Sequence, residues 1–149
     1  MINKNLFVFI AFSLTLWACN DIPDCNNAGE PNAVIVKFYN TSDSSALTLA
    51  IDSIKAADTD SIFYEAESLS TFNLILDPSQ DATTFYFYTP TDTDTISFSY
   101  KRVNSVISVE CGPGIEFFDI TVQSHSFDSA AVKFDFLNIQ LTDNIEIYN

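Results

Sequence analysis

Basic residues and glycine are both scarce in this chain of 149 residues. It holds 6 Lys and Arg against 20 Asp and Glu, which gives a net charge of −14, and it has only 3 Gly. Binding to nucleic acid or to an anionic membrane surface needs patches of Lys and Arg, so the charge excludes both as partners. With so little glycine, the chain also has no glycine-rich loop to cradle a phosphate.

Histidine and cysteine are equally rare, with one and three copies and no clustered Cys/His metal motif. His125 is flanked by Ser124 and Ser126, and these residue types could supply a Ser-His-Asp triad. No Gly-x-Ser-x-Gly nucleophile motif accompanies them. We therefore interpret His125 as a solvated turn residue and expect no cofactor and no enzyme activity. A small secreted hydrolase is the alternative.

Residues 1–18 are predicted to be a secretory signal peptide. Lys4 gives a weakly basic start, and residues 6–17 are apolar apart from Ser13 and Thr15. This stretch is shorter than the roughly 20 apolar residues that a transmembrane helix needs. A signal peptide typically has a charged start, an apolar stretch of this length and a small residue before the cleavage site.

Cys19 makes the prediction more specific. It directly follows Ala18 and lies three positions after Leu16, which resembles a bacterial lipoprotein signal, although Trp17 stands where a small or β-branched residue is usual. The resemblance implies cleavage before Cys19 and attachment of acyl chains to it, and several chains anchor a protein far better than one. Ordinary secretion with a cut nearby is the alternative.

Two cysteines, Cys25 and Cys111, are left beside the predicted anchor. Exported proteins can keep disulfides, and neither cysteine has the spacing of a metal or redox motif. We predict a Cys25–Cys111 disulfide, which would close a loop of about 86 residues; two free thiols are the alternative. Residues 19–32 are predicted to be a polar, lipid-anchored tether, and residues 33–149 a single domain.

The domain has the alternating pattern of half-buried strands, in short runs separated by turn residues. This predicts an all-β fold, an antiparallel β-sandwich of about eight short strands, with a small β-barrel as the alternative. Residues 62–69 are interpreted as a helical turn or a loop, and a bulge near residues 136 and 137 would explain a slip in phase. The predicted strands cover residues 33–39, 47–54, 71–76, 83–89, 95–102, 105–111, 115–122, 131–141 and 144–148.

Residues 95–122 are predicted to form a three-stranded meander at the centre of the sheet. Gly112, Pro113 and Gly114 break the alternation between its second and third strands, where a hairpin loop is expected. In this register Cys111 lies on the core face, and so does Phe118.

Aromatic residues give the strongest sign of a binding surface. Tyr86, Tyr88 and Phe117 are predicted to lie off the core face, where exposed rings can stack on a sugar or anchor a protein partner. Packing under a loop or at the edge of the sheet is the alternative.

The acidic turns at residues 58–60 and 92–94 carry oxygen ligands that suit Ca²⁺. Neither continues into a twelve-residue calcium loop, so we interpret both as solvated turns and expect no metal.

Several short motifs together resemble a family of small Bacteroidetes envelope lipoproteins of unknown function. They are the lipoprotein start, the early cysteine, residues 100–102 (Tyr-Lys-Arg), residues 111–113 (Cys-Gly-Pro), residues 117–118 (Phe-Phe) and the closing residues 144–148. The resemblance implies an all-β lipoprotein of the cell envelope and carries no catalytic residues. An acidic stretch after the lipidated cysteine marks export to the surface in that phylum, and residues 20–24 match it only in part.

The sequence therefore predicts an outer-membrane lipoprotein, facing the periplasm or the surface, that acts as a non-catalytic binding or accessory module. Its expected partners are the membrane, through the lipid, and an envelope protein or a glycan. A hydrolase would need acidic side chains that converge with His125 or with each other in a cleft. A barrel that binds a small apolar ligand would need an internal cavity.

Overall fold

The structure is a computed structural model that describes residues 32–57, 59, 61–108, 112–137 and 143–149. Within these residues every regular element is a strand, which confirms the predicted all-β class. The strands are β1 (Ala33–Tyr39), β2 (Leu49–Ala56), β3 (Ile62–Leu69), β4 (Thr71–Ile75), β5 (Ala82–Tyr88), β6 (Thr93–Ser108), β7 (Gly112–His125), β8 (Ser129–Val132) and β9 (Ile145–Tyr148).

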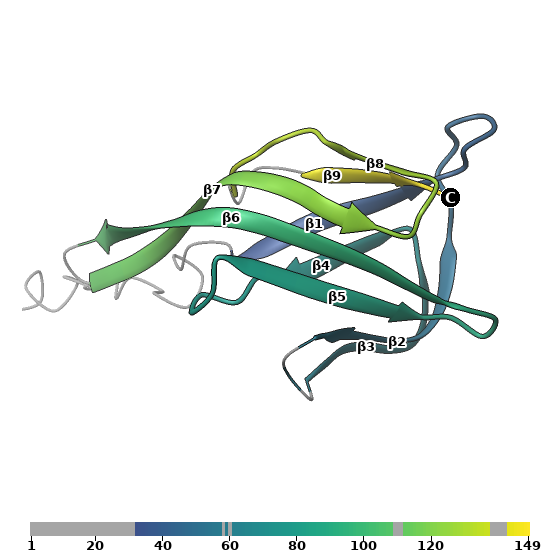
Figure 1. Cartoon of the computed structure of the whole chain (residues 1–149), viewed down its shortest axis with the longest axis horizontal. Helices are drawn as coiled ribbons and strands as arrows, with labels where there is room; N and C mark the ends of the chain where they lie inside the picture. Colours follow the sequence, from purple (N-terminus) through teal and green to yellow (C-terminus); the bar gives the residue numbers. More distant parts are fainter. Residues whose placement is uncertain (1–31, 58, 60, 109–111, 138–142) are drawn as a thin grey trace, which may run out of the picture.

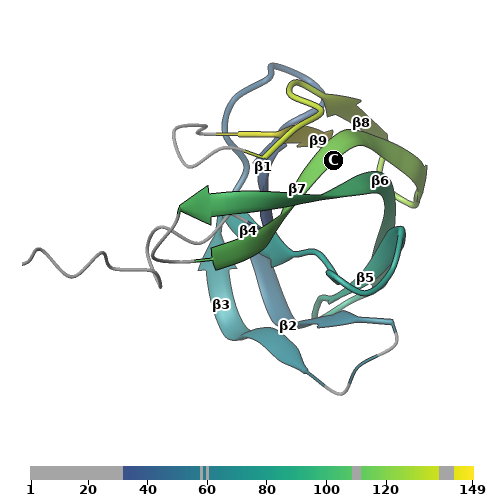
Figure 2. The ribbon, with the colours of Figure 1, turned by 90° about the vertical axis from the view of Figure 1, so that its left-hand side faces the viewer.

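The strands form two sheets packed face to face (Figures 1 and 2). One sheet has four strands in the order β4-β1-β9-β8, and the other has five in the order β3-β2-β5-β6-β7. Neighbouring strands are antiparallel except β1 and β9, which pair in parallel. The predicted β-sandwich is thus confirmed, and the alternative of a closed barrel is wrong.

Strict alternation on the central strands supplies the core. Residues 85–88 read Phe-Tyr-Phe-Tyr, and because successive side chains of a strand point to opposite faces, Phe85 and Phe87 are buried while Tyr86 and Tyr88 lie on the other face. Rings from both sheets meet edge to face in the core, as the 5.7 Å contact between Phe38 and Phe87 shows. The other aromatic residues of the core are Phe72, Phe98, Tyr100, Phe117 and Phe127.

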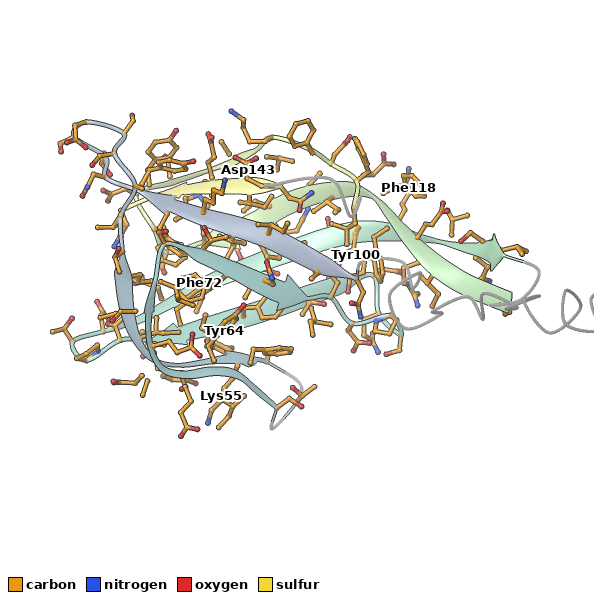
Figure 3. The ribbon with its side chains drawn as sticks, turned by 180° about the vertical axis from the view of Figure 1, so that it is seen from behind. Lys55, Tyr64, Phe72, Tyr100, Phe118 and Asp143 are labelled. Atoms are coloured by element: carbon orange, nitrogen blue, oxygen red, sulfur yellow. The ribbon has the colours of Figure 1, made fainter. Side chains whose placement is uncertain are left out.

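The two sheets are joined where β3 passes into β4 through Ser70 alone. The Tyr64 hydroxyl accepts a hydrogen bond from the backbone amide of Asn73, 2.8 Å away, and its ring meets Phe72 edge to face at 5.1 Å (Figure 3). On the other side, the Leu137 amide donates to the Phe117 carbonyl, so the chain after β8 covers part of the β7 edge.

The predicted three-stranded meander is wrong, because two long strands replace it. Strand β6 runs without a break from Thr93 to Ser108 and pairs with β7 along most of its length. The glycines expected in a loop belong to β7, where Gly112 pairs with Ser108 and Gly114 with Ser105. Strand β5 reaches only Ser99 of β6, so the far part of the β6–β7 hairpin extends beyond the sheet as a two-stranded arm (Figure 1).

The prediction that Phe117 lies off the core face is also wrong, since it is 2% exposed. The cause is a bulge in β7, where two residues lie between Phe118 and Thr121 while only one lies between their partners on β6. Asp119 takes up the extra residue with a φ of 52°. The bulge reverses the alternation, so Phe117 and Ile120 both point into the core, and Phe118 is exposed instead of buried.

Two further predictions need correction. Residues 62–69 are a strand, β3, and neither a helical turn nor a loop. The strand predicted over residues 131–141 ends at Val132, and the phase slip near residues 136 and 137 falls in irregular chain, not in a bulged strand. His125 closes strand β7 and is exposed there.

Some predictions concern residues outside the described ranges. They are the signal peptide at 1–18, the lipidated Cys19, the tether up to residue 31, and the Cys25–Cys111 disulfide. Asp58 and Asp60 of the first acidic turn also lie outside. All of these stay predictions.

Candidate functional site

The outer face of the five-stranded sheet is a continuous surface of hydroxyl groups around two tyrosines. Residues that pair directly across neighbouring strands share a face, and the pairing places the following side chains together, a set we call the hydroxyl face. It comprises Ser53 and Lys55 of β2; Thr84, Tyr86 and Tyr88 of β5; Thr95, Ser97 and Ser99 of β6; and Thr121, Gln123 and Ser124 of β7.

The tyrosines of this face lie next to each other because they are two positions apart on β5. The ring centres of Tyr86 and Tyr88 are 6.3 Å apart, with planes inclined by 36°. Both rings are partly exposed. The Lys55 ammonium group lies 5.8 Å from the centre of the Tyr88 ring, within the range of a cation–π contact, and Figure 3 shows Lys55 on the outer side of the molecule.

Beside the rings, neutral groups are linked by hydrogen bonds. The Thr84 hydroxyl donates to Ser97 Oγ at 2.9 Å. Gln123 Nε2 donates to Ser99 Oγ at 2.8 Å and to Thr121 Oγ1 at 3.1 Å. A second bulge in β7, opposite Ser97 and Phe98, adds one residue, so that Ser124 lies on this face beside Gln123, which follows Thr121 by two positions. The site therefore combines aromatic rings with fixed, uncharged donors and acceptors.

The predicted patch of three rings is thus a patch of two. Tyr86 and Tyr88 are together on the hydroxyl face, and Phe117 belongs to the core, where its ring meets Tyr100 at 5.3 Å. Sequence reasoning missed Lys55 and Gln123. Lys55 could have been found from its place in an alternating strand. Gln123 could have been found in the same way, because it follows Thr121 by two positions and shares its face.

The outer face of the four-stranded sheet also carries two tyrosines, but in charged surroundings. Tyr39 and Tyr148 pair across β1 and β9, and their rings stack with centres 5.6 Å apart and planes inclined by 29°. The Tyr148 hydroxyl donates to Glu146, which also pairs with Lys133 at 3.2 Å. Each of these two rings covers one side of the other.

A pocket of about 240 Å³ opens at one end of the sandwich, which we call the end pocket. It lies where β2 ends and β3 begins, beside the end of β4 and the start of β5. Its lining is mostly small or aliphatic: Ala56, Ala57, Thr59, Phe63, Ile75, Leu76, Asp77, Pro78, Ala82, Thr83 and Thr84.

A buried hydrogen-bonded chain lies under the end pocket. The hydroxyls of Thr83 and Tyr100 are 2.6 Å apart, and Tyr100 also donates to the Asp77 carbonyl at 2.9 Å. Burial raises the pKa of Tyr100, so the phenol keeps its proton. The Ser79 hydroxyl and amide both donate to the Asp77 carboxylate and lower the pKa of Asp77, which favours its ionised form.

The opposite end of the sandwich is acidic. A shallow pocket of about 530 Å³ there is lined by Asp92 and Asp94, together with Ser126 and Asn149. Asp94 accepts a hydrogen bond from the Ser126 hydroxyl at 2.7 Å. Across the described residues, no group of three or more His, Cys, Asp or Glu is arranged to hold a metal ion.

His125 lies near this acidic end. Its Nδ1 is 2.9 Å from the Phe127 carbonyl, so that ring nitrogen contacts the backbone. Its neighbour Ser124 lies on the hydroxyl face. Of the residues on which a hydrolase could depend, the structure places His125 at a strand end and spreads the acidic side chains over both ends and both faces.

Comparison with known proteins identifies one family. Residues 36–149 match the family described as a family of unknown function, DUF6452. The chain belongs to this family. The match covers β2 to β9 and the second half of β1, from Val36 on, and so includes every strand that builds the hydroxyl face and the end pocket. No curated protein and no solved structure matches the chain. Among the described residues, no helix has the length and apolar character to cross a membrane.

Proposed function

We propose that this protein is a lipid-anchored envelope module that binds a neutral glycan through its hydroxyl face. The observation that carries the proposal is the Tyr86–Tyr88 pair beside uncharged hydrogen-bonding groups. Aromatic rings bury the apolar C–H face of a sugar, while hydroxyl and amide groups exchange hydrogen bonds with sugar hydroxyls. This is the chemistry that the hydroxyl face offers across four neighbouring strands.

Charge favours a neutral ligand. The chain has a net charge of −14, which opposes an acidic polysaccharide. Lys55 is the one cation at the centre of the face, and it lies over the Tyr88 ring. Lys101, at the rim, is paired with Asp119. Little positive charge on this surface is therefore free to attract an anionic sugar.

The anchor is supported by the sequence alone. The apolar residues 6–17, Ala18 and the following cysteine have the pattern of a bacterial lipoprotein signal, and several motifs resemble small Bacteroidetes lipoproteins. Acyl chains on Cys19 would hold the module at a membrane through the tether at residues 19–32. The glycan would then be a component of the envelope or of its surroundings.

The glycan proposal is tested by binding of the full-length protein, in phosphatidylcholine nanodiscs, to a panel of immobilised polysaccharides. We expect retention on at least one neutral glycan and none on carboxylated or sulfated glycans. Replacement of Gln123 by Ala should weaken binding by roughly five- to tenfold, since one or two hydrogen bonds are lost. The matched control, Gln80→Ala, lies in the turn before β5 and should bind normally. Retention by anionic glycans alone, or by no glycan, would refute the proposal. Capture of a protein that binds equally well to both variants would favour a protein partner over a glycan.

The anchor is tested by the intact mass of the protein extracted from membranes. We expect cleavage before Cys19 with added acyl chains, and two thiols that react with an alkylating reagent only after reduction. A soluble protein without acyl chains and with free thiols would contradict both the anchor and the Cys25–Cys111 disulfide.

A further inference from the structure

The end pocket is formed by small side chains at a place where the two sheets separate. Ala56 ends β2, Ala57 follows it, and Ala82 begins β5. Larger side chains at these positions would fill the space, as Phe63 does on one side, where it packs against the core ring Phe85 at 5.7 Å. The pocket of about 240 Å³ exceeds the roughly 150 Å³ of an apolar cavity that accepts benzene.

The polar atoms at the floor of the pocket already have partners. The Thr83 hydroxyl accepts from the Asp77 amide at 3.0 Å and is bonded to Tyr100. The Ala57 amide donates to the Thr84 carbonyl at 2.8 Å. A ligand would find methyl and methylene groups at the floor and no polar group in need of a partner, so the pocket suits an apolar chain.

Charge at the mouth of the pocket should discriminate between the head groups of possible ligands. The Asp77 carboxylate lies there and is held by Ser79 at 2.6 and 2.7 Å. Arg102 lies nearby, but its guanidinium is paired with Asp81 at 2.7 Å and donates to the Pro78 carbonyl. An anionic head group would meet the negative charge of Asp77, whereas a neutral or cationic head group would not be repelled.

We propose that the end pocket binds the alkyl chain of an amphiphile whose head group is neutral or cationic. Phe63 is the one aromatic residue of a lining made otherwise of small and aliphatic side chains, three threonines and Asp77, which favours a hydrocarbon chain over a flat ring system. The Leu76 amide donates to the Asn32 carbonyl at 2.7 Å, so the segment that precedes β1 meets the domain beside the pocket. Figure 1 shows the start of β1, the end of β4 and the start of β5 at this same end. An acylated Cys19 would therefore keep the pocket near lipid, and this last step, unlike the pocket itself, rests on the proposed anchor.

The test uses the full-length protein with ¹³C-labelled alanine methyl groups in phosphatidylcholine nanodiscs. Primary alcohols of increasing length, from butanol to decanol, are titrated while the methyl signals are followed. We expect saturable shifts of the methyl groups of Ala56, Ala57 and Ala82, and none at Ala46 or Ala131, which lie elsewhere. Affinity should rise by roughly fourfold for each methylene, the factor expected for burial of one such group, until the pocket is full, and then level off. Shifts that never saturate, or that affect all alanines alike, would overturn the proposal.

Two variants separate the pocket from simple partition into lipid. Ala82→Leu, which fills the pocket from an exposed position, should abolish the saturable shifts, while Ala131→Leu on β8 should leave them unchanged. Octanoate should bind at least fivefold more weakly than octanol or octylammonium, and Asp77→Asn should remove most of this difference. If Ala82→Leu binds as well as the unmodified protein, the pocket is not the site. The two sites adjoin, since Thr84 belongs to both, but these readouts measure binding of alkyl chains and not of glycans, so their failure would leave the glycan proposal intact.

Discussion

The two outer faces of the sandwich carry similar pairs of tyrosines in opposite chemical settings. On the four-stranded sheet, Tyr39 and Tyr148 stack on each other, and the Tyr148 hydroxyl is bonded to a glutamate that also pairs with a lysine. On the five-stranded sheet, Tyr86 and Tyr88 lie among hydroxyl and amide groups, and Lys55 over the Tyr88 ring is the one charged group of the face. An exposed pair of rings is therefore not by itself a binding site. Its neighbours decide whether the rings serve the fold or are available to a ligand.

The largest expected effect on the free energy of unfolding tests whether the tyrosine rings of the hydroxyl face contribute little to the stability of the core. Phe87 and Tyr86 are neighbours on β5 but lie on opposite faces. Phe87→Ala should lower the free energy of unfolding by about 3–5 kcal/mol, because it leaves a cavity among packed rings. Tyr86→Ala should lower it by about 1 kcal/mol or less, because the ring is partly exposed. Urea unfolding of both variants checks this, and equal losses would mean that Tyr86 is structural.

Tyr100 is buried, unlike the tyrosines of the two outer faces, and its replacement should have an intermediate effect on the free energy of unfolding. Tyr100→Phe removes the hydroxyl that bonds Thr83 and the Asp77 carbonyl, and should cost about 1–2 kcal/mol. Burial raises the folded-state pKa of Tyr100 above the ordinary value of about 10. Its neutral form therefore contributes stability that is fully present below pH 10 and is lost as the pH rises through the folded pKa.

Unfolding measured from pH 8 to 11 should show this loss in the unmodified protein and a shallower loss in Tyr100→Phe. Identical alkaline slopes in the two proteins would contradict the account of Tyr100.

The smallest effect concerns the ion pairs that distinguish the two outer faces. Glu146→Gln breaks the contact with Lys133 and should lower the melting temperature slightly at low ionic strength. At about 1 M salt, where the Debye length is only about 3 Å, the difference from the unmodified protein should shrink. Ser97→Ala on the hydroxyl face should show a change that does not depend on salt. A salt-dependent change in Ser97→Ala would mean that the hydroxyl face is not electrostatically neutral.

Alternation predicted from the sequence was most reliable where a strand pairs regularly on both sides. It correctly assigned Tyr86 and Tyr88 to the face away from the core, and it predicted a sandwich. In the first strand, residues 33–39, the same alternation puts Val34, Val36 and Phe38 on one face, and all three are buried. In these strands a period of two suffices, because each side chain position follows directly from the one before.

The same reasoning failed where β7 bulges. One extra residue at Asp119 turned Phe117 inward, and another, after Val122, brought Ser124 onto the hydroxyl face beside Gln123. A bulge depends on the register of the partner strand, which no local pattern of residues 112–125 contains. The end pocket was missed for a related reason, since it is formed by small side chains from segments that are distant in the sequence.

The central claim is that the neighbours of the rings, and not the rings alone, make the hydroxyl face a glycan-binding surface. The most direct test measures the affinity of the full-length protein for the neutral glycan that it retains, in two matched double variants. Tyr86→Ala with Tyr88→Ala should weaken binding at least tenfold, or about 1.4 kcal/mol. Tyr39→Ala with Tyr148→Ala should leave the affinity unchanged within twofold. Equal losses in the two double variants, or a loss confined to the second, would contradict the claim.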